Sequence, residues 1–277
     1  MRDPLFRMAL VLGLLAAVGP FAVDMYLPAL PQVARDLNTS ETAAAMTLTA
    51  YFITFGIAQM VYGPMADALG RKLPIVIGTA IFLAATLAAI LAPSIGWLIA
   101  ARALQGLGSA TLMVVPRAVI RDLATGPAAA RMMAAIMIVI SVSPMLAPLT
   151  GSLVMAWGGW REIFAVLAAA AAFSLCLTLF VLPETLPVEH RRPVQLRPIL
   201  SGAGRLLSDR RFMGLTMIGG FGLASFFVFL SAASFVYTRQ YGLSPTGFSL
   251  AFAINAVGFF TASQFAGPMA DRFGTER

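Results

Sequence analysis

The stretch that decides the architecture of this chain is GPMADALGRK, residues 63–72, because the same residues begin a second stretch, GPMADRFG, residues 267–274. The second copy starts 204 residues after the first. Ser40 and Ser244 are separated by the same interval, and each is placed to cap a helix that leads into one copy. Five identical residues in a row at equivalent places indicate an internal repeat. The sequence therefore predicts two related halves.

The composition excludes an ordinary soluble domain. Of the 277 residues, 59% are hydrophobic and 11% are charged, whereas soluble domains are about 45–50% apolar and about 25% charged. Lipid is therefore the expected solvent. The net charge of +7 also occurs in nucleic-acid-binding proteins, but those cluster Lys and Arg on one face, and here they lie in short gaps between apolar runs.

Eight apolar runs are long enough to cross a bilayer, which takes about 20 helical residues. Their approximate bounds are 7–30, 43–65, 74–93, 96–116, 132–156, 162–182, 212–236 and 247–267. The first run resembles a signal peptide but is expected to be a retained span. The expected organisation is a six-helix N-terminal half (1–182), a cytoplasmic linker without an apolar run (183–211), and a partial C-terminal half of two helices (212–277).

The basic residues predict the orientation. With the N-terminus in the cytoplasm, fifteen of the 19 Lys and Arg residues fall on the inner side. Arg35, Arg161 and Arg239 fall outside, and Arg102 lies within a span. This bias matches the excess of positive charge that cytoplasmic loops carry.

The repeated stretch resembles the signature loop of the major facilitator superfamily, Gly-x-x-x-Asp-x-x-Gly-Arg-Lys, between helices 2 and 3. The resemblance implies an all-α polytopic membrane protein in which Asp67 closes the cytoplasmic side by pairing with a helix-terminal arginine, Arg121 being a candidate. The gating residues implied in this way are Gly63, Asp67, Gly70, Arg71, Arg121 and, in the second copy, Asp271.

Further motifs support the resemblance. ARALQG at 101–106 is similar to the helix-4 motif, and residues 144–151 are similar to the helix-5 antiporter motif, with Pro144, Pro148 and Gly151 in place. Ala147 and Ser152 stand where glycines are usual in that motif. Residues 21–31 are similar to the helix-1 signature of the Bcr/CflA drug-resistance subfamily. Members have twelve spans, so the resemblance implies that this chain stops after eight.

Asp24 and Arg102 are the leading candidates for proton coupling. A charged side chain at a helix centre costs about 2.5–3.5 kcal/mol on translocon scales and therefore needs a function or a partner. Helical rise places Asp24 about 12 Å and Arg102 about 9 Å below the outer ends of their helices, so we expect them to pair. Two structural alternatives stay open: Asp24 is a solvated helix end, and Arg102 binds backbone carbonyls.

The remaining expectations concern ligands. An adaptable apolar cavity is predicted from Met25, Tyr26, Tyr51, Gln59, Gln105 and Asn255. One Cys and one His cannot build a zinc site, and we expect no metal and no cofactor besides the proton as coupling ion.

The resemblance implies a monomeric proton-driven exporter of small amphipathic drugs in the bacterial inner membrane, with no nucleic-acid partner. Two alternatives are an exporter of an endogenous metabolite and a transport-incompetent remnant. An intramembrane enzyme is disfavoured, because the sequence has no His-Glu-x-x-His, Gly-x-Ser-x-Gly or phosphate-binding glycine motif.

Overall fold

The computed structural model describes residues 4–193, 196–265 and 272, and within them it is built of helices and connecting turns. The elements are α1 (Pro4–Asp24), the 3₁₀ turn η1 (Leu27–Ala29), α2 (Leu30–Asp36), α3 (Glu41–Leu69), α4 (Lys72–Ile90), α5 (Ile95–Leu123), α6 (Gly126–Met155), α7 (Trp160–Phe180), η2 (Val188–His190), α8 (Leu196–Ser208), α9 (Arg210–Phe235), the π-turn η3 (Val236–Gln240) and α10 (Pro245–Gln264). The all-α polytopic class is confirmed.

Seven helical segments of the described chain are long and apolar enough to cross a membrane. They correspond to the first seven predicted spans, with α1, η1 and α2 forming one span, Leu5–Asp36. Helix α10 stands where the eighth span was predicted, although its described part falls outside this set of seven. The first span is broken into pieces because Pro28 and Pro31 lack the N–H that would continue a helix.

The helix starts reproduce the repeat seen in the sequence. Ser40 Oγ accepts a hydrogen bond from the Ala43 N–H at 3.1 Å, and Ser244 Oγ accepts one from the Gly247 N–H at 3.1 Å. Both serines therefore cap the helix that follows, with the same spacing. The second signature copy itself, Asp271 included, lies outside the described residues apart from Arg272.

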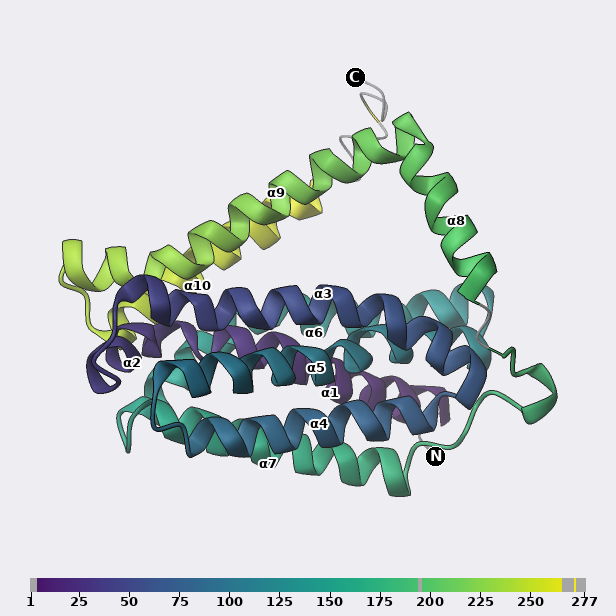
Figure 1. Ribbon diagram of the computed structural model, residues 1–277, viewed down its shortest axis with the longest axis horizontal. Helices are drawn as coiled ribbons and strands as arrows, with labels where there is room; N and C mark the ends of the chain where they lie inside the picture. Colours follow the sequence, from purple (N-terminus) through teal and green to yellow (C-terminus); the bar gives the residue numbers. More distant parts are fainter. Residues whose placement is uncertain (1–3, 194–195, 266–271, 273–277) are drawn as a thin grey trace.

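Helices α1 and α3 to α7 form a six-helix bundle whose long axes run together (Figure 1). Glycines let the helices approach closely. A Cβ on Gly106 of α5 would collide with the Tyr51 carbonyl of α3, and one on Gly108 would collide with the Gly78 carbonyl of α4. Small residues at such crossings are typical of membrane helix packing, which depends on close van der Waals contact.

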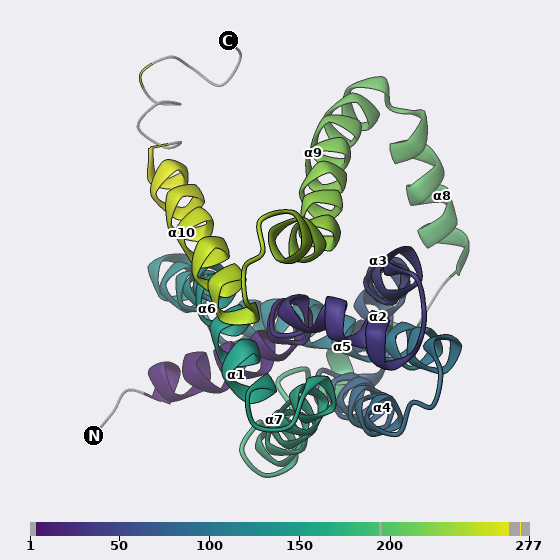
Figure 2. The same ribbon diagram turned by 90° about the vertical axis from the view of Figure 1, so that its left-hand side faces the viewer.

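The linker, for which the sequence predicted no membrane span, contains a helix that the sequence analysis did not predict. Helix α8 occupies Leu196–Ser208 and runs across the direction of the bundle helices in both views (Figures 1 and 2). The apolar-run criterion could not find it, because its hydrophobic residues are spaced along one helical face rather than consecutive.

Helices α9 and α10 contact the bundle at one end only. The buried residues of α9 are confined to its last turns, from Leu230 to Phe235, whereas its earlier apolar residues such as Leu215 and Ile218 are exposed. Both helices diverge from the bundle toward the end where α8 lies (Figure 1).

Candidate functional site

Arg102 lies at the centre of the six-helix bundle and is fully buried. Its Nη1 donates to the Ala22 carbonyl of α1 at 3.1 Å and to Gln105 Oε1. Its guanidinium carbon lies 4.6 Å from the centre of the Tyr51 ring and 4.9 Å from that of Tyr26. The charge is thus held by a carbonyl, an amide and two aromatic faces, which are favourable partners for a desolvated guanidinium.

Hydroxyl groups extend this cluster across four helices. Gln105 Nε2 donates to Thr86 Oγ1 at 2.8 Å, and the Thr47 hydroxyl donates to the Tyr26 hydroxyl at 3.1 Å. The Tyr51 hydroxyl, 2.8 Å from Ser109 Oγ, completes it. A network that joins so many helices rigidifies the bundle and specifies its packing.

The expected ion pair between Asp24 and Arg102 is not formed. Arg102 binds the Ala22 carbonyl instead, and Asp24 Oδ2 accepts a hydrogen bond from Ser143 Oγ of α6 at 3.3 Å. The rings of Tyr26 and Tyr51 lie next to the guanidinium instead. Arg102 therefore has the carbonyl-binding arrangement that the sequence left as an alternative.

Asp24 occupies the last position of α1 and is 7% exposed. Among the described residues no basic side chain pairs with it, and its one hydrogen-bond donor is Ser143. Ser143 directly precedes Pro144, and Gly151 further along α6 lies so close to the Met25 backbone that a Cβ would collide with it. The helix-5 motif thus forms the contact between α6 and the end of α1.

The predicted cavity residues separate into two groups. Met25, Tyr26, Tyr51 and Gln105 are packed in the bundle core with at most 1% exposure, so they do not line an open space in this conformation. Asn255 of α10 is exposed and donates to the Tyr237 hydroxyl at 3.3 Å, and Gln59 of α3 is half-buried.

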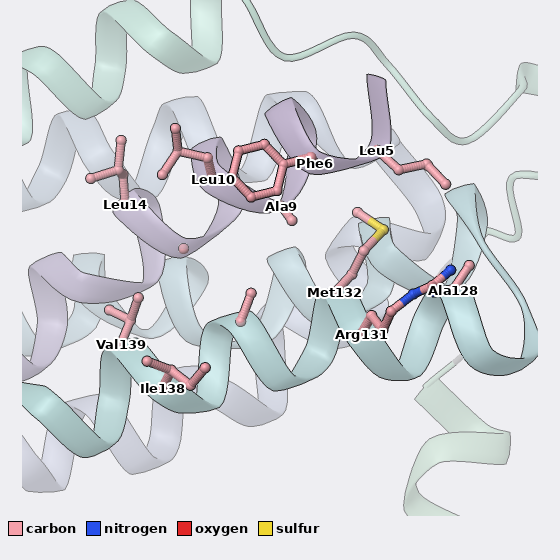
Figure 3. A pocket seen from close by; sticks show the side chains of 12 residues that line it. Leu5, Phe6, Ala9, Leu10, Leu14, Ala128, Arg131, Met132, Ile138 and Val139 are labelled. Atoms are coloured by element: carbon pink, nitrogen blue, oxygen red, sulfur yellow. The ribbon is translucent and has the colours of Figure 1, made fainter. Parts of the chain in front are cut away.

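A different apolar groove of about 730 Å³ lies between α1 and α6 (Figure 3). Leu5, Phe6, Leu10, Leu14 and neighbouring residues form one wall, and Met132, Ile138 and Val139 lie on the other. Arg131 is the one charged residue of this lining. The groove lies on the same pair of helices as Asp24 and Ser143 and has the apolar lining that is usual for small-molecule sites.

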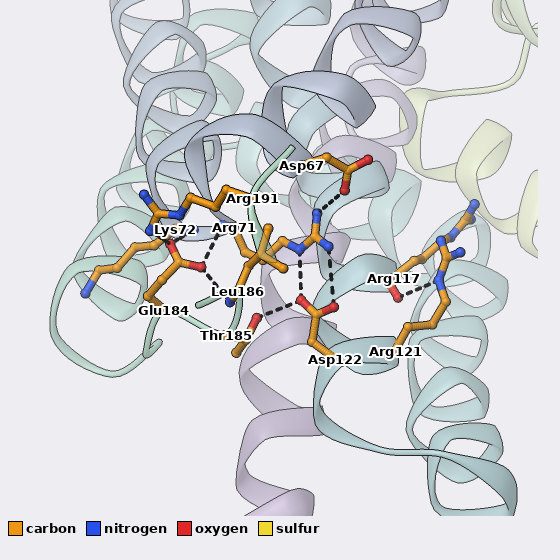
Figure 4. A network of polar contacts seen from close by, with 10 residues as sticks. All are labelled: Asp67, Arg71, Lys72, Arg117, Arg121, Asp122, Glu184, Thr185, Leu186 and Arg191. Atoms are coloured by element: carbon orange, nitrogen blue, oxygen red, sulfur yellow. Dashed lines mark hydrogen bonds and ion pairs between the residues drawn. The ribbon is translucent and has the colours of Figure 1, made fainter. Parts of the chain in front are cut away.

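The signature loop forms a polar network at the end of the bundle (Figure 4). Arg71 Nη1 lies 2.6 Å from Asp67 Oδ1, and Arg71 Nε lies 2.8 Å from Asp122 Oδ2. Burial lowers the pKa of Arg71, but the hydrogen bonds and negative charges of Asp122 and Asp67 raise it above its usual value overall. Gly63, Asp67, Arg71, Arg121 and Asp122 line one cavity of about 310 Å³.

The predicted pairing of Asp67 with Arg121 is wrong in this structure. Asp67 pairs with Arg71 of its own loop, and Arg121 donates to the Arg117 carbonyl at 3.4 Å. Consecutive residues of an α-helix point about 100° apart, and on α5 it is Asp122 rather than Arg121 that reaches the loop.

The first residues of the linker form hydrogen bonds with the signature loop and with Asp122. Glu184 accepts hydrogen bonds from the backbone N–H groups of Arg71 at 2.8 Å and Lys72 at 3.2 Å, and so caps α4. Burial raises the pKa of Glu184, but these backbone donors, with Leu186, lower it below its usual value overall. Thr185 donates to Asp122 at 3.1 Å, and the Arg192 N–H donates to the Asp67 carbonyl at 2.9 Å. Gly70 needs its φ of +94°, and a side chain there would collide with Glu184.

Comparison with known proteins decides the family. The sequence profile described as Major Facilitator Superfamily matches residues 12–277. The chain belongs to the Major Facilitator Superfamily. This is a family of transporters rather than enzymes, as the names of its relatives and structural neighbours state.

Drug-resistance proteins are among the relatives of this major facilitator chain. It is 38% identical over 269 residues to the uncharacterised MFS-type transporter YdgK of Bacillus subtilis, covering 96% of this chain and 66% of that one. It is 35% identical over 274 residues to multidrug resistance protein D of Escherichia coli (97% and 67% covered). It is 30% identical to the bicyclomycin resistance protein homolog of Haemophilus influenzae (98% and 68% covered). The chain spans about two thirds of the length of these relatives.

Solved structures confirm the major facilitator fold. A bacterial homolog of the human lysosomal transporter Spinster, inward-facing and occupied, superposes with a TM-score of 0.81 at 16% identity, over 99% of this chain and 64% of that one. A D-xylose–proton symporter superposes with a TM-score of 0.72 at 19% identity, over 98% and 70%. At these identities the likeness concerns the fold alone.

In this major facilitator chain, contacts between α9–α10 and the bundle gather at the end opposite the signature loop. Arg239 Nη1 lies 2.5 Å from Glu41 Oε1 at the start of α3, and Ser249 Oγ donates to the Pro148 carbonyl at 2.8 Å. The centres of the Phe52 and Phe227 rings lie 4.0 Å apart. The two parts are therefore joined at one end and separated at the other.

Sequence reasoning missed three residues that these contacts use. Asp122, Glu184 and Glu41 were not among the candidates, although each lies within four residues of a helix end. A helix end with unpaired backbone N–H groups, as at Arg71, is a signal that an acidic group is needed nearby. The sequence does not show which acidic residue accepts these hydrogen bonds, because Glu184 is 113 residues away from Arg71.

Proposed function

We propose that this chain is part of a proton-coupled exporter of small amphipathic drugs in a bacterial inner membrane, with its N-terminus in the cytoplasm. The observation that carries the proposal is Asp24, a buried carboxyl group in a membrane span whose one donor in the described structure is the Ser143 hydroxyl. Acidic groups in such places are rare and mark ion pathways and proton relays. Arg102 serves the bundle as an anchor rather than as the counter-ion.

The substrate class is supported by the relatives and by the groove. Relatives carry names for resistance to bicyclomycin and chloramphenicol and for multidrug resistance. The groove between α1 and α6 has an apolar lining, which suits molecules with a large hydrophobic part. We therefore infer that the groove, rather than the packed residues Met25, Tyr26, Tyr51 and Gln105, belongs to the path of the drug.

The coupling follows from the position of Asp24. Its carboxyl group bonds α6 through Ser143, and the same two helices form the groove. Loss or gain of a proton changes what the carboxyl can accept from or donate to Ser143, and a drug in the groove acts on the same contact between helices. A proton and a drug that bias one two-state equilibrium are coupled by thermodynamic necessity.

The orientation is supported by the arginines and by the network at the signature loop. The network sits at the arginine-rich end of the bundle, and cytoplasmic loops are the ones that carry an excess of Lys and Arg.

Transport in proteoliposomes tests the proposal. The full gene product is reconstituted, a pH gradient is imposed, and uptake of radiolabelled chloramphenicol and bicyclomycin is followed. We expect accumulation on the acidic side, opposite to proton flow, and its collapse with a protonophore. Accumulation that is unaffected by the protonophore would contradict proton coupling, and accumulation of neither drug would contradict the substrate class.

A further inference from the structure

Helix α8 differs from the long helices of the described chain in how its hydrophobic residues are arranged. In Leu196–Ser208 the apolar residues recur at intervals of three or four, at positions 196, 199, 200, 203, 206 and 207. Arg197, Ser201, Arg205 and Ser208 occupy the positions between them. One face of the helix is therefore apolar and the opposite face is basic and polar.

The apolar face is uncovered at its described end. Leu206 is 49% exposed and Leu207 is 66% exposed. The helix touches α9, to which Asp209 joins it as the N-cap, and it extends from the end of the six-helix bundle away from it (Figures 1 and 2). At these two leucines, therefore, no other part of the described chain covers the apolar face.

The surroundings are strongly basic. Residues 191–211 hold six arginines and a single acid, Asp209, whose carboxylate is engaged by the N–H groups of Arg211 and Phe212. Such a density of positive charge complements an anionic surface.

The position and direction of the helix identify that surface. The membrane span α7 ends at Phe180 and the span α9 begins at Arg210, so α8 connects two points at the same face of the bilayer. Thirteen helical residues are about 20 Å long, and α8 runs across the direction of the spans, which is the direction of the membrane plane (Figure 1).

We propose that α8 is an interfacial helix that binds the anionic lipids of the leaflet next to the signature loop. The apolar face lies among the acyl chains, and the arginines lie at the level of the lipid phosphates, where they bind them by charge and hydrogen bonds. The inference depends on the membrane location of the chain and not on drug export.

Site-directed spin labelling of the full chain tests this assignment. Single-cysteine variants Leu207→Cys, on the apolar face, and Ser201→Cys, on the polar face, are made in a Cys176→Ser background, because Cys176 is exposed. Each labelled protein is reconstituted in phosphatidylcholine vesicles with and without a third of phosphatidylglycerol. Collision rates are measured with oxygen, which concentrates among acyl chains, and with a water-soluble nickel chelate.

With phosphatidylglycerol present, we expect the label at 207 to collide several-fold more with oxygen than the label at 201, and several-fold less with nickel. Removing the negative lipid, or adding Arg197→Gln and Arg205→Gln, should reduce this difference. Equal nickel access at both sites would overturn the proposal. A label at 207 shielded from both reagents would overturn it as well, because protein would then cover the face. A difference unchanged by lipid charge would overturn the assignment to anionic lipid.

Discussion

At the scale of single residues, Arg102 illustrates how a charge is kept inside a membrane bundle. Its partners are neutral: a carbonyl, an amide oxygen and two aromatic rings. A guanidinium suits this environment because it is planar, stacks on rings and is more weakly hydrated than an ammonium group. The residue therefore joins α1, α3 and α5 without needing a carboxylate.

Arg102→Ala should lower the stability of the bundle. The Ala22 carbonyl and Gln105 would lose a donor, and a buried acceptor left without one costs about 1–3 kcal/mol. Arg102→Lys should recover only part of the loss, because an ammonium group cannot stack on both rings. Thermal unfolding in detergent is the measurement, and Arg35→Ala, at an exposed arginine, is the control. An unchanged midpoint for Arg102→Ala would show that the cluster does not hold the helices together.

The sequence predicted which residues are unusual better than it predicted their partners. The sequence analysis identified Asp24, Arg102, Asp67 and Arg71, because a charge within an apolar run and a repeated motif can both be recognised from the sequence alone. Their pairings were partly wrong, since helical rise gives depth but the facing of each side chain depends on how the helices rotate against one another. Tyr26 and Tyr51 were predicted to line a cavity, and nothing in the sequence indicated that their rings lie beside the Arg102 guanidinium.

At the scale of elements, close helix approach depends on particular glycines. Gly106→Ala should destabilise the α3–α5 contact, because the new Cβ would collide with the Tyr51 carbonyl, and overpacking costs about 1–3 kcal/mol. Gly56→Ala on α3 is the matched control: nothing lies within 4 Å of its Cβ position. That variant should be neutral or slightly stabilising, since Ala is favoured over Gly in helices by about 1 kcal/mol. Equal midpoints of thermal unfolding for Gly106→Ala and Gly56→Ala would contradict this account of the α3–α5 interface.

The cap that Glu184 places on α4 predicts a dependence on pH. Its pKa lies below the usual value in the folded protein, so its contribution is present at neutral pH and is lost as the pH falls through that lowered pKa. Glu184→Gln should remove this dependence and speed hydrogen exchange at the Arg71 and Lys72 amides, whose protons it accepts. Glu189→Gln, at an exposed acid of the same linker, is the control. Exchange rates unchanged by Glu184→Gln would show that the linker does not hold the loop.

At this scale the sequence predicted the order of the first seven spans, but it predicted neither their exact ends nor the linker helix. Helix α5 continues seven residues past its predicted end, to Leu123, because the apolar signal stops at Arg117 but the helix does not. Helix α8 was missed because its six apolar residues are distributed over thirteen positions. A continuous run of hydrophobic residues indicates a helix that crosses the bilayer. It does not indicate a helix such as α8, whose hydrophobic residues lie on one face only.

At the scale of the whole molecule, the contact between Arg239 and Glu41 is expected to favour closure at its end of the transporter. Arg239→Glu should place two negative charges side by side. Their repulsion should shift the population toward conformations that are open at this end. The effect should be less than about tenfold, because exposed pairs are worth about 0–1 kcal/mol. Reversing both charges should restore the original distribution. Distances between spin labels on α2 and η3 measure it, and a double variant no better than the single one would refute a direct pairing.

The central claim, that Asp24 carries the coupled proton, is tested most directly by counting protons released when drug binds. The purified full gene product is placed in weakly buffered detergent solution, and the pH change on addition of the transported drug is recorded. The wild type should release protons, and Asp24→Asn should bind the drug and release none. Glu162→Gln, at an exposed acid of α7, should behave as the wild type. Proton release by Asp24→Asn equal to that of the wild type would contradict the account, because the proton would then leave from another group.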